Sequence, residues 1–326
     1  MSETEINKLY PQSFLISVVF PVYNEEENLI VLHKQVRSYL LSAGVNYEMI
    51  FVDNGSDDNS LYIIKNLLKE DSCVKYISLS RNFGHQNALF AGMCQSRGDA
   101  IITMDADLQH PPSLLPIMID CWKTGVNIVY TSKRNTDLPR IKKMFIQIFY
   151  FIISKISGLK IGFGESDFRL IDKKVWEIIR SIPEYHKFFR GLVKWIGFKS
   201  KEVLYDVGNR YCGKSKFSYG NLISFALDGI ISFSRYPLRL LTLFGFFISF
   251  SSILYIIWIC IASLAQLLSI SFLKNIFLPP GWATLTVAIL FLGSIQLIAI
   301  GILGEYIGRI FDQVKGRPNY IINEKS

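Results

Sequence analysis

Two aspartates placed two residues apart, Asp105 and Asp107, are the residues in this chain best suited to chemistry. They follow an apolar run at 100–104 that is bounded by Gly and Pro, a pattern typical of a buried strand in a parallel sheet. Residues two apart in extended backbone point to the same side, so both carboxylates, together with Gln109, can share one hard cation. The segment is therefore interpreted as a metal clamp for phosphates, although an isolated Asp-x-Asp also occurs in ordinary solvated turns.

The elements that must position these carboxylates are strands that alternate with helical segments. The expected strands are Phe14 to Phe20, Tyr47 to Val52, Val74 to Leu79, Ala100 to Met104 and Asn127 to Thr131. Polar segments, PVYNEEENL and DNGSDDNS, follow the first two strands, and Asp53, Ser56 and Asp57 can bind turn backbone or a ligand. The alternation predicts an α/β fold with a mostly parallel sheet, whose ligands lie beyond the carboxyl ends of the strands.

Two long segments contain no Asp, Glu, Lys, Arg or His: 240–273 and 281–304. A membrane span needs roughly 20 apolar residues, so both are expected to cross a bilayer. Basic residues precede the first span and follow the second, whereas the connection between them carries only Lys274, which predicts both ends in the cytoplasm. The polar N-terminus shows no signal peptide. The expected organisation is a cytoplasmic domain at 1–232, a two-helix transmembrane domain at 233–310 and a cytoplasmic tail at 311–326.

Several further features concern the membrane and possible partners. Segments 141–156 and 221–234 combine apolar and basic residues and are candidate interfacial helices, although the first reads equally well as a core helix. The net charge of +8 is assigned to a lipid surface rather than to nucleic acid. Five cysteines without a C-x-x-C pair indicate a reducing compartment. Gly304 and Gly308 form a G-x-x-x-G that predicts a homo-oligomer, with a tetramer as one form.

The ordered set of motifs resembles the polyprenyl-phosphate glycosyltransferases, inverting enzymes of the GT-A fold that include dolichol-phosphate mannose synthase and the bactoprenol glucosyltransferases. The resemblance runs through SVVFPVYNEEENL, FVDNGSDDNS, LSRNFGHQNALFAG, MDADLQHPP, SDFRLIDKKV, YCGKSKFSYG, DGIISFSRYPLR and GEYIGRIFDQVKGRPNY, which covers nearly the whole chain. Two spans after the catalytic domain favour the bactoprenol branch.

The resemblance implies roles for individual residues. The nucleotide pocket would comprise Pro21, Tyr23, Asn24, Glu25, Asp53, Asp57, Asp105, Ala106 and Asp107, and the metal ligands would be Asp105, Asp107 and Gln109. The metal would be Mg²⁺ or Mn²⁺, which fits ligands that are all oxygen. Donor or acceptor phosphates would be held by Arg134, Arg210, Lys214 and Lys216.

Asp167 matches an acidic position near the acceptor in related transferases, and it is carried as a catalytic candidate with Arg134. A phosphate monoester has a second pKa of about 6, so a lipid phosphate is largely dianionic at neutral pH and can attack without a base. Asp167 is therefore either a base or a group that orients Arg169 or a sugar hydroxyl. His85 and His110 flank the pocket motifs and are read as structural.

The predicted reaction is transfer of a hexose, with glucose from UDP-glucose favoured, onto polyprenyl phosphate with inversion, to give a β-linked product at the cytoplasmic face of the cell membrane. Another donor, such as GDP-mannose, a UDP-aminosugar or a modified arabinose, is the nearest alternative. A processive polysaccharide synthase would carry a Q-x-x-R-W motif and more spans. A membrane scaffold of the same fold without catalysis is the alternative from another class, and intact Asp105 and Asp107 argue against it.

Overall fold

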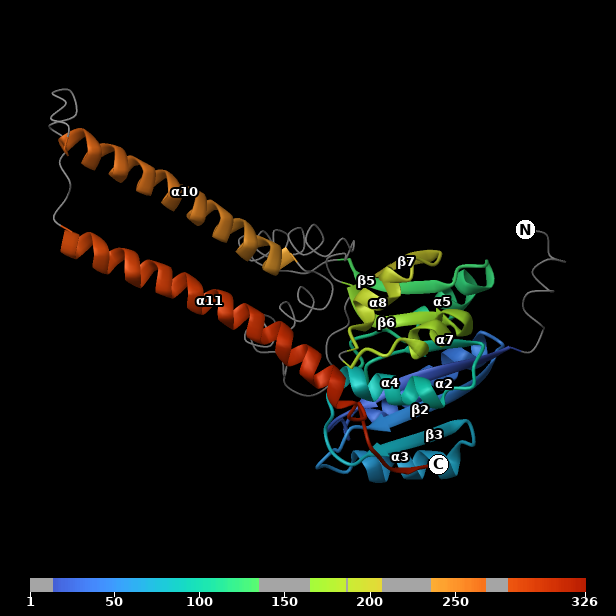
Figure 1. The fold of residues 1–326 in the computed structure, drawn as a ribbon. Coiled ribbons are helices and arrows are strands. Elements are labelled where there is room, and N and C mark those ends of the chain that lie inside the picture. Colours follow the sequence, from blue (N-terminus) through green and yellow to red (C-terminus); the bar gives the residue numbers. More distant parts are fainter. Residues whose placement is uncertain (1–13, 135–164, 186, 207–235, 268–280) are drawn as a thin grey trace. The chain divides into compact units, whose positions relative to one another are not determined.

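The computed structural model describes residues 14–134, 165–185, 187–206, 236–267 and 281–326. The chain divides into two compact units, one of Met1–Ser232 with Gly316–Ser326 and the other of Phe233–Lys315. The first unit contains β1 (Leu15–Val22), α2 (Leu29–Ser42), β2 (Asn46–Asp53), α3 (Ser60–Glu70), β3 (Val74–Leu79), α4 (His85–Gln95), β4 (Ala100–Thr103), α5 (Leu114–Lys123), β5 (Ile128–Lys133), β6 (Glu165–Asp172), α7 (Lys173–Ser181), α8 (Phe189–Trp195), β7 (Ser200–Tyr205) and β8 (Ile322–Lys325) (Figure 1).

The described strands form one sheet in the order β7-β5-β6-β4-β1-β2-β3-β8. Strands β4, β1, β2 and β3 are parallel neighbours, and β5 and β7 are also parallel. All five strands expected from the sequence are present, and the expected α/β architecture with a mostly parallel, GT-A-like sheet is confirmed. The carboxyl ends of β1, β2 and β4 meet at one edge of this sheet, which we call the site edge.

Strand β6 is antiparallel to both of its neighbours, β4 and β5, and was not expected from the sequence. Because it runs in the opposite direction, its first residues lie at the site edge, where β4 ends. In the register of this pair Thr103 lies opposite Arg169. Asp105 lies two residues after Thr103 and Asp167 lies two residues before Arg169, so in this antiparallel pair both continue from it in the same direction. The insertion of β6 therefore brings a residue far along the sequence next to the Asp105 segment.

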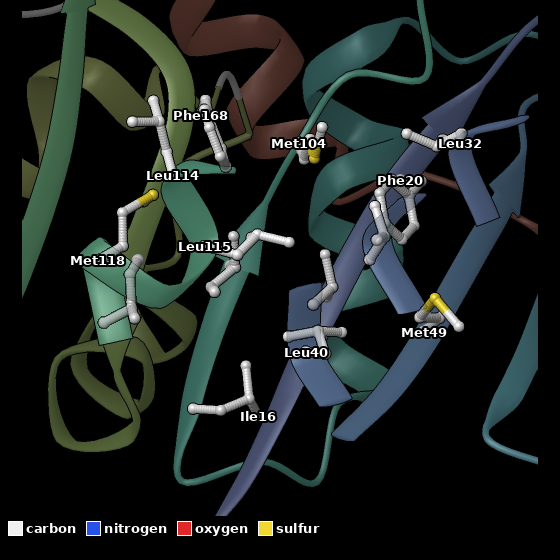
Figure 2. Packing of buried hydrophobic residues seen from close by; sticks show 14 of the residues in the cluster. Ile16, Phe20, Leu32, Leu40, Met49, Met104, Leu114, Leu115, Met118 and Phe168 are labelled. Atoms are coloured by element: carbon white, nitrogen blue, oxygen red, sulfur yellow. The ribbon is translucent and has the colours of Figure 1, made fainter. Parts of the chain in front are cut away.

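The core lies between the sheet and helices on both faces. Alternate residues of β1, such as Ile16 and Phe20, pack with Leu32 of α2 and Leu115 of α5, as Figure 2 shows. Val19, the residue directly before Phe20 in β1, points to the opposite face of the sheet and lies next to Gly92 of α4. This alternation is how a strand buried on both faces contributes to two layers.

The first unit is completed by residues that follow the last long helix. Strand β8 pairs antiparallel with β3, and Glu324 forms an ion pair with Lys65 at 2.6 Å. Just before it, the Tyr320 ring lies 6.2 Å from the Phe90 ring. The segment 311–326, which the sequence analysis assigns to a tail, contains the end of the last long helix, at Lys315, and the strand β8.

The second unit consists of α10 (Tyr236–Leu267) and α11 (Gly281–Lys315). Each contains a stretch long and apolar enough to cross a membrane, Leu238–Tyr255 and Phe291–Lys315, and neither stretch is buried by the protein. Around Gly301, Gly304 and Gly308 no heavy atom lies within 4 Å of where a Cβ would be. The structure describes one chain, so association through these glycines stays a prediction. The candidate interfacial helices at 141–156 and 221–234 lie outside the described residues.

Helix α4 lies unusually close to the sheet at one position, and this closeness sets where its first turn lies. A Cβ on Gly92 would lie 2.4 Å from Val19 Cγ1 and 2.8 Å from Val52 Cγ2. No real side chain tolerates such contacts, so only glycine lets α4 sit at this distance.

We predict that Gly92→Ala lowers the free energy of unfolding by about 1–3 kcal/mol, because overpacking outweighs the gain in helix propensity. Denaturant unfolding of the solubilised protein measures the change. Combining it with Val19→Ala, which removes the nearer methyl group, should cost less than the sum of the two single changes. Additive losses would show that the contact does not set the position of the helix.

Candidate functional site

The Asp105 segment leaves β4 at the site edge. Asp107 accepts a hydrogen bond from the backbone N–H of Gln109 through Oδ1 at 3.1 Å, and Leu108 between them has a φ of 62°. The backbone N–H of Asp105 donates to Nδ1 of His110 at 3.2 Å. This side-chain bonding holds the turn so that both carboxylates stay at the end of the strand.

His110 is buried, and its ring stacks on Phe168 with the ring centroids 5.2 Å apart. Burial lowers the pKa of this imidazole, although the neighbouring carboxylates of Asp105 and Asp107 work in the opposite direction. Because Nδ1 accepts a hydrogen bond, we assign His110 as the neutral tautomer with its proton on Nε2. These contacts of His110 are structural ones, and its absence from the chemistry stays a prediction.

His85 is a different case, because the structure places it directly on Asp105. Its Nε2 lies 2.8 Å from Asp105 Oδ1, and it begins helix α4. Burial opposes the charge of both groups, yet the Asp105 carboxylate raises the pKa of His85, and the nearby imidazoles of His110 and His85 lower the pKa of Asp105 to about 2. The sequence interpretation read His85, like His110, as structural and did not include it among the site residues. The available signal was its place at the start of a helix that follows a strand ending at the same edge.

The loops that follow β1 and β2 are joined by hydrogen bonds. The backbone N–H of Asn24 donates to Ser56 Oγ at 3.0 Å, and its side-chain Oδ1 accepts from the N–H of Asp57 at 2.8 Å. Asn24 has a φ of 54°, a left-handed conformation that asparagine tolerates better than most residues. The N–H of Glu25 donates to Ser60 Oγ at 3.0 Å. The structure thus brings together the predicted nucleotide residues of these two loops.

Asp53 and Pro21 are buried, whereas Asp57 is exposed. Asp53 accepts from the N–H of Ser56 at 3.1 Å and from Ser78 Oγ at 3.1 Å. Through these bonds the carboxylate stabilises the loop. Asp53 therefore has a structural role, whether or not it also contacts the nucleobase.

Asp167 is the most strongly held carboxylate of the site. Arg190 binds it with two hydrogen bonds, Nε to Oδ1 at 3.0 Å and Nη2 to Oδ2 at 2.9 Å, and Arg169 Nη2 lies 3.3 Å from Oδ1. Gln86 Nε2 donates to Oδ2 at 3.3 Å. Although burial would raise the pKa of Asp167, the two guanidinium groups lower it far below the ordinary aspartate range. A carboxylate held so firmly in its ionised form is a weak general base.

The predicted phosphate ligands are only partly within the described residues. Arg134 follows β5 and forms an ion pair with Asp206 at 3.7 Å, and both side chains are exposed. The carboxyl ends of β5 and β7 meet at the site edge, so Arg134 lies at this edge of the sheet. Arg210, Lys214 and Lys216 lie outside the described residues. Their predicted role stays a prediction.

The Asp105 segment fits a divalent cation in its chemistry. Asp105 and Asp107 offer carboxylate oxygens, and the Asp105 side chain is 34% exposed, so an ion can reach it. Within the described ranges, no group of three or more His, Cys, Asp or Glu side chains is placed to hold a metal. A shell made of one or two carboxylates, an amide, phosphate oxygens and water is the arrangement typical of Mg²⁺, which retains several waters.

The sequence of this chain is similar to those of known glycosyltransferases. The model of glycosyl transferase family 2 matches residues 17–179. The chain is 42% identical over 313 residues to a prophage-derived bactoprenol glucosyl transferase of Shigella flexneri, which covers 95% of this chain and 97% of that protein. It is 39% identical over 309 residues to a prophage bactoprenol glucosyl transferase homolog of Escherichia coli, covering 94% and 98%. An uncharacterized glycosyltransferase of Synechocystis is 40% identical over 310 residues, covering 95% of each chain.

Among solved structures, glucosyl-3-phosphoglycerate synthase of Mycobacterium tuberculosis, in complex with Mn²⁺, UDP and phosphoglyceric acid, has a TM-score of 0.49 and 19% identity. The match covers 69% of this chain and 80% of that one.

We predict that Asp167→Asn destabilises the protein at pH 7 by about 3–5 kcal/mol, because it leaves the buried guanidinium of Arg169 and the partly buried one of Arg190 without their carboxylate. The folded-state pKa of Asp167 is lowered, so its stabilising contribution is present above the unfolded-state pKa of about 3.9 and is lost as the pH falls below that value. Thermal unfolding of both proteins between pH 7 and pH 3 should therefore show a difference that narrows on acidification. A difference that stays constant with pH would contradict the ion-pair account.

Proposed function

Since the chain belongs to glycosyl transferase family 2, we propose that it transfers a glucosyl group from a nucleotide sugar to a polyprenyl phosphate. The observation that carries this proposal is the similarity to bactoprenol glucosyl transferases along 95% of the chain, apolar C-terminal helices included. A soluble transferase domain alone would match over the catalytic part only. The lipid acceptor follows from that full-length match, and UDP-glucose is the donor we favour.

The proposed chemistry is a single displacement with inversion. An oxygen of the acceptor phosphate forms a bond to the anomeric carbon while the bond from that carbon to the β-phosphate oxygen breaks. The nucleoside diphosphate leaves with the bonding electrons. Because the acceptor phosphate is largely dianionic at neutral pH, its second pKa being about 6, no proton has to be removed by the enzyme. The strong pairing of Asp167 with Arg190 supports this base-free route.

Asp105, Asp107 and Gln109 would hold a divalent cation at the donor diphosphate. When bound, the cation supplies Lewis-acid neutralisation of the charge that develops on the leaving group. His85 helps to keep the Asp105 carboxylate ionised and fixes its orientation, and the hydrogen bond from the backbone N–H of Gln109 fixes the orientation of the Asp107 carboxylate. The loops at Asn24 and Asp57 would bind the nucleoside.

The two apolar helices suit an enzyme whose acceptor is dissolved in a bilayer. We propose that α10 and α11 anchor the catalytic unit at the membrane, with that unit and both chain ends on the cytoplasmic side, where nucleotide sugars are made. Arg134 at the site edge, together with Arg210, Lys214 and Lys216, would bind the phosphates of donor or acceptor.

The deciding experiment is to incubate the purified full-length protein with a polyprenyl phosphate and a panel of nucleotide sugars, and to identify the glycolipid by mass. A polyprenyl-phosphate hexose formed from UDP-glucose is the expected product. Product from GDP-mannose or a UDP-aminosugar instead would keep the reaction and change the donor. Absence of product with every donor, from protein that binds UDP, would favour a scaffold without catalysis.

We predict that Asp105→Asn and Asp107→Asn each lower turnover by at least about a hundredfold, because each removes an anionic ligand from the cation. Circular dichroism checks that the fold is kept. Asp120→Asn, at an exposed carboxylate of α5 that is assigned to no binding site, is the matched control and should leave turnover near that of the wild type. Addition of EDTA should abolish turnover, and Mg²⁺ or Mn²⁺ in excess should restore it. Full turnover in EDTA would remove the metal from the mechanism.

A further inference from the structure

Helix α8 is fastened to strand β6 by two ion pairs in register. Arg190 pairs with Asp167, and Lys194, one helical turn later, pairs with Glu165, two residues earlier on the strand. Residues four apart share a helix face and residues two apart share a strand face, so the two pairs lie side by side. The side chains of Asp167 and Glu165 are at most 10% exposed. Because the Lys194–Glu165 pair also holds α8 against β6, the Arg190–Asp167 pair can have a further role.

Of the two ion pairs, the Arg190–Asp167 pair is the one connected to Asp105 of the proposed cation clamp. The β4–β6 register carries Asp105 and Asp167 onward from the Thr103–Arg169 pair, and Thr103 Oγ1 donates to the carbonyl of Asp167 at 2.5 Å. Two adjacent residues in the first turn of α4 connect the same carboxylates, since His85 contacts Asp105 and Gln86 contacts Asp167. Arg190 therefore belongs to one side-chain cluster with the clamp for the cation.

The charge and shape of this cluster suit a phosphate. Arg169 and Arg190 both contact the single carboxylate of Asp167, and the pKa of Arg169 is lowered by burial and further by the charge of Arg190. Both guanidinium groups bring positive charge to the start of β6, where a phosphate would be attracted, and the carboxylates of Glu165 and Asp105 lie in the same cluster. The Arg190 side chain is 22% exposed, whereas that of Arg169 is 4% exposed, so a ligand can reach only the former. Two hydrogen bonds to one carboxylate fix the plane of the Arg190 guanidinium, and a planar, fixed guanidinium is the group that matches the geometry of phosphate oxygens.

Resting on the proposed function, we propose that Arg190 is a phosphate-binding residue of the transfer reaction, and that Asp167 is the positioning residue that fixes its guanidinium. The phosphate is either the diphosphate of the donor or the monoester of the acceptor, because both carry the same oxygens. In this arrangement Asp167 acts through Arg190 and takes no proton from the substrate. Neither the DxD segment nor the basic positions matched by the family resemblance include this residue.

The test compares Arg190→Gln and Arg190→Lys with Lys194→Gln, which breaks the neighbouring ion pair on the same helix and strand. We expect Arg190→Gln to raise KM for one of the two substrates about tenfold to hundredfold, the effect of losing a hydrogen bond to a charged group. Arg190→Lys should recover part of the loss, since it keeps the charge without the fork. Lys194→Gln should leave both KM values near those of the wild type. Calorimetric titration with UDP, and separately with farnesyl phosphate, supplies a readout that does not depend on turnover.

The outcomes separate the possible sources and failures. A higher KM for the nucleotide sugar with weaker UDP binding assigns Arg190 to the donor diphosphate. A higher KM for the lipid with weaker farnesyl phosphate binding assigns it to the acceptor. Unchanged KM and affinity in Arg190→Gln, or an equal rise in Lys194→Gln, would overturn the inference, because then only the seating of α8 matters. If Arg190→Gln does not fold, Arg190→Lys decides in the same way, and wild-type values in that variant overturn the inference. A wild type that makes no glycolipid would refute the proposed function, and the titrations would still decide whether Arg190 binds phosphate.

Discussion

Carboxylates gathered in a poorly hydrated place repel one another and lose hydration, so each needs a positive partner in fixed geometry. The site edge meets this constraint for three of its carboxylates, with His85 beside Asp105, Arg190 and Arg169 beside Asp167, and Lys194 beside Glu165. These partners come from three helices and strands that are distant in sequence. The arrangement of α4, β6 and α8 around the end of β4 is therefore as much an electrostatic requirement as a packing one.

The two Asp residues of the clamp are visible in the sequence because their spacing is local. The strand before them is short and apolar, and strand periodicity is enough to place both carboxylates at its end. The loops after β1 and β2 are equally local, since their polar residues directly follow their strands. In each of these cases the residues of the site are close together in the chain, and sequence patterns can predict arrangements of that kind.

The partners of the carboxylates could not be predicted in this way. Arg190 reaches Asp167 only because β6 enters the sheet antiparallel, and direction within a sheet is a property of the whole fold. His85 reaches Asp105 because Gly92 lets α4 approach β1 closely, a contact that depends on the absence of a side chain. A histidine or an arginine beside a motif has many possible roles, and the three-dimensional arrangement selects one. Asp167 is a similar case. The family resemblance makes it a candidate base, whereas its contacts in the structure show that it holds Arg190.

Strand β8 has a consequence for how the chain is synthesised. It pairs with β3 across more than 240 residues, and both apolar helices lie in the interval, as the bond between Tyr76 and Glu324 illustrates. During translation β3 remains an open sheet edge, with unpaired backbone groups, until the helices have been made and delivered to their final environment. Closing such a long loop is slow and entropically costly. The sheet can therefore be completed only after both apolar helices have been synthesised. If a ribosome stalls before β8, the edge of β3 stays unpaired, and two nascent chains can associate through it.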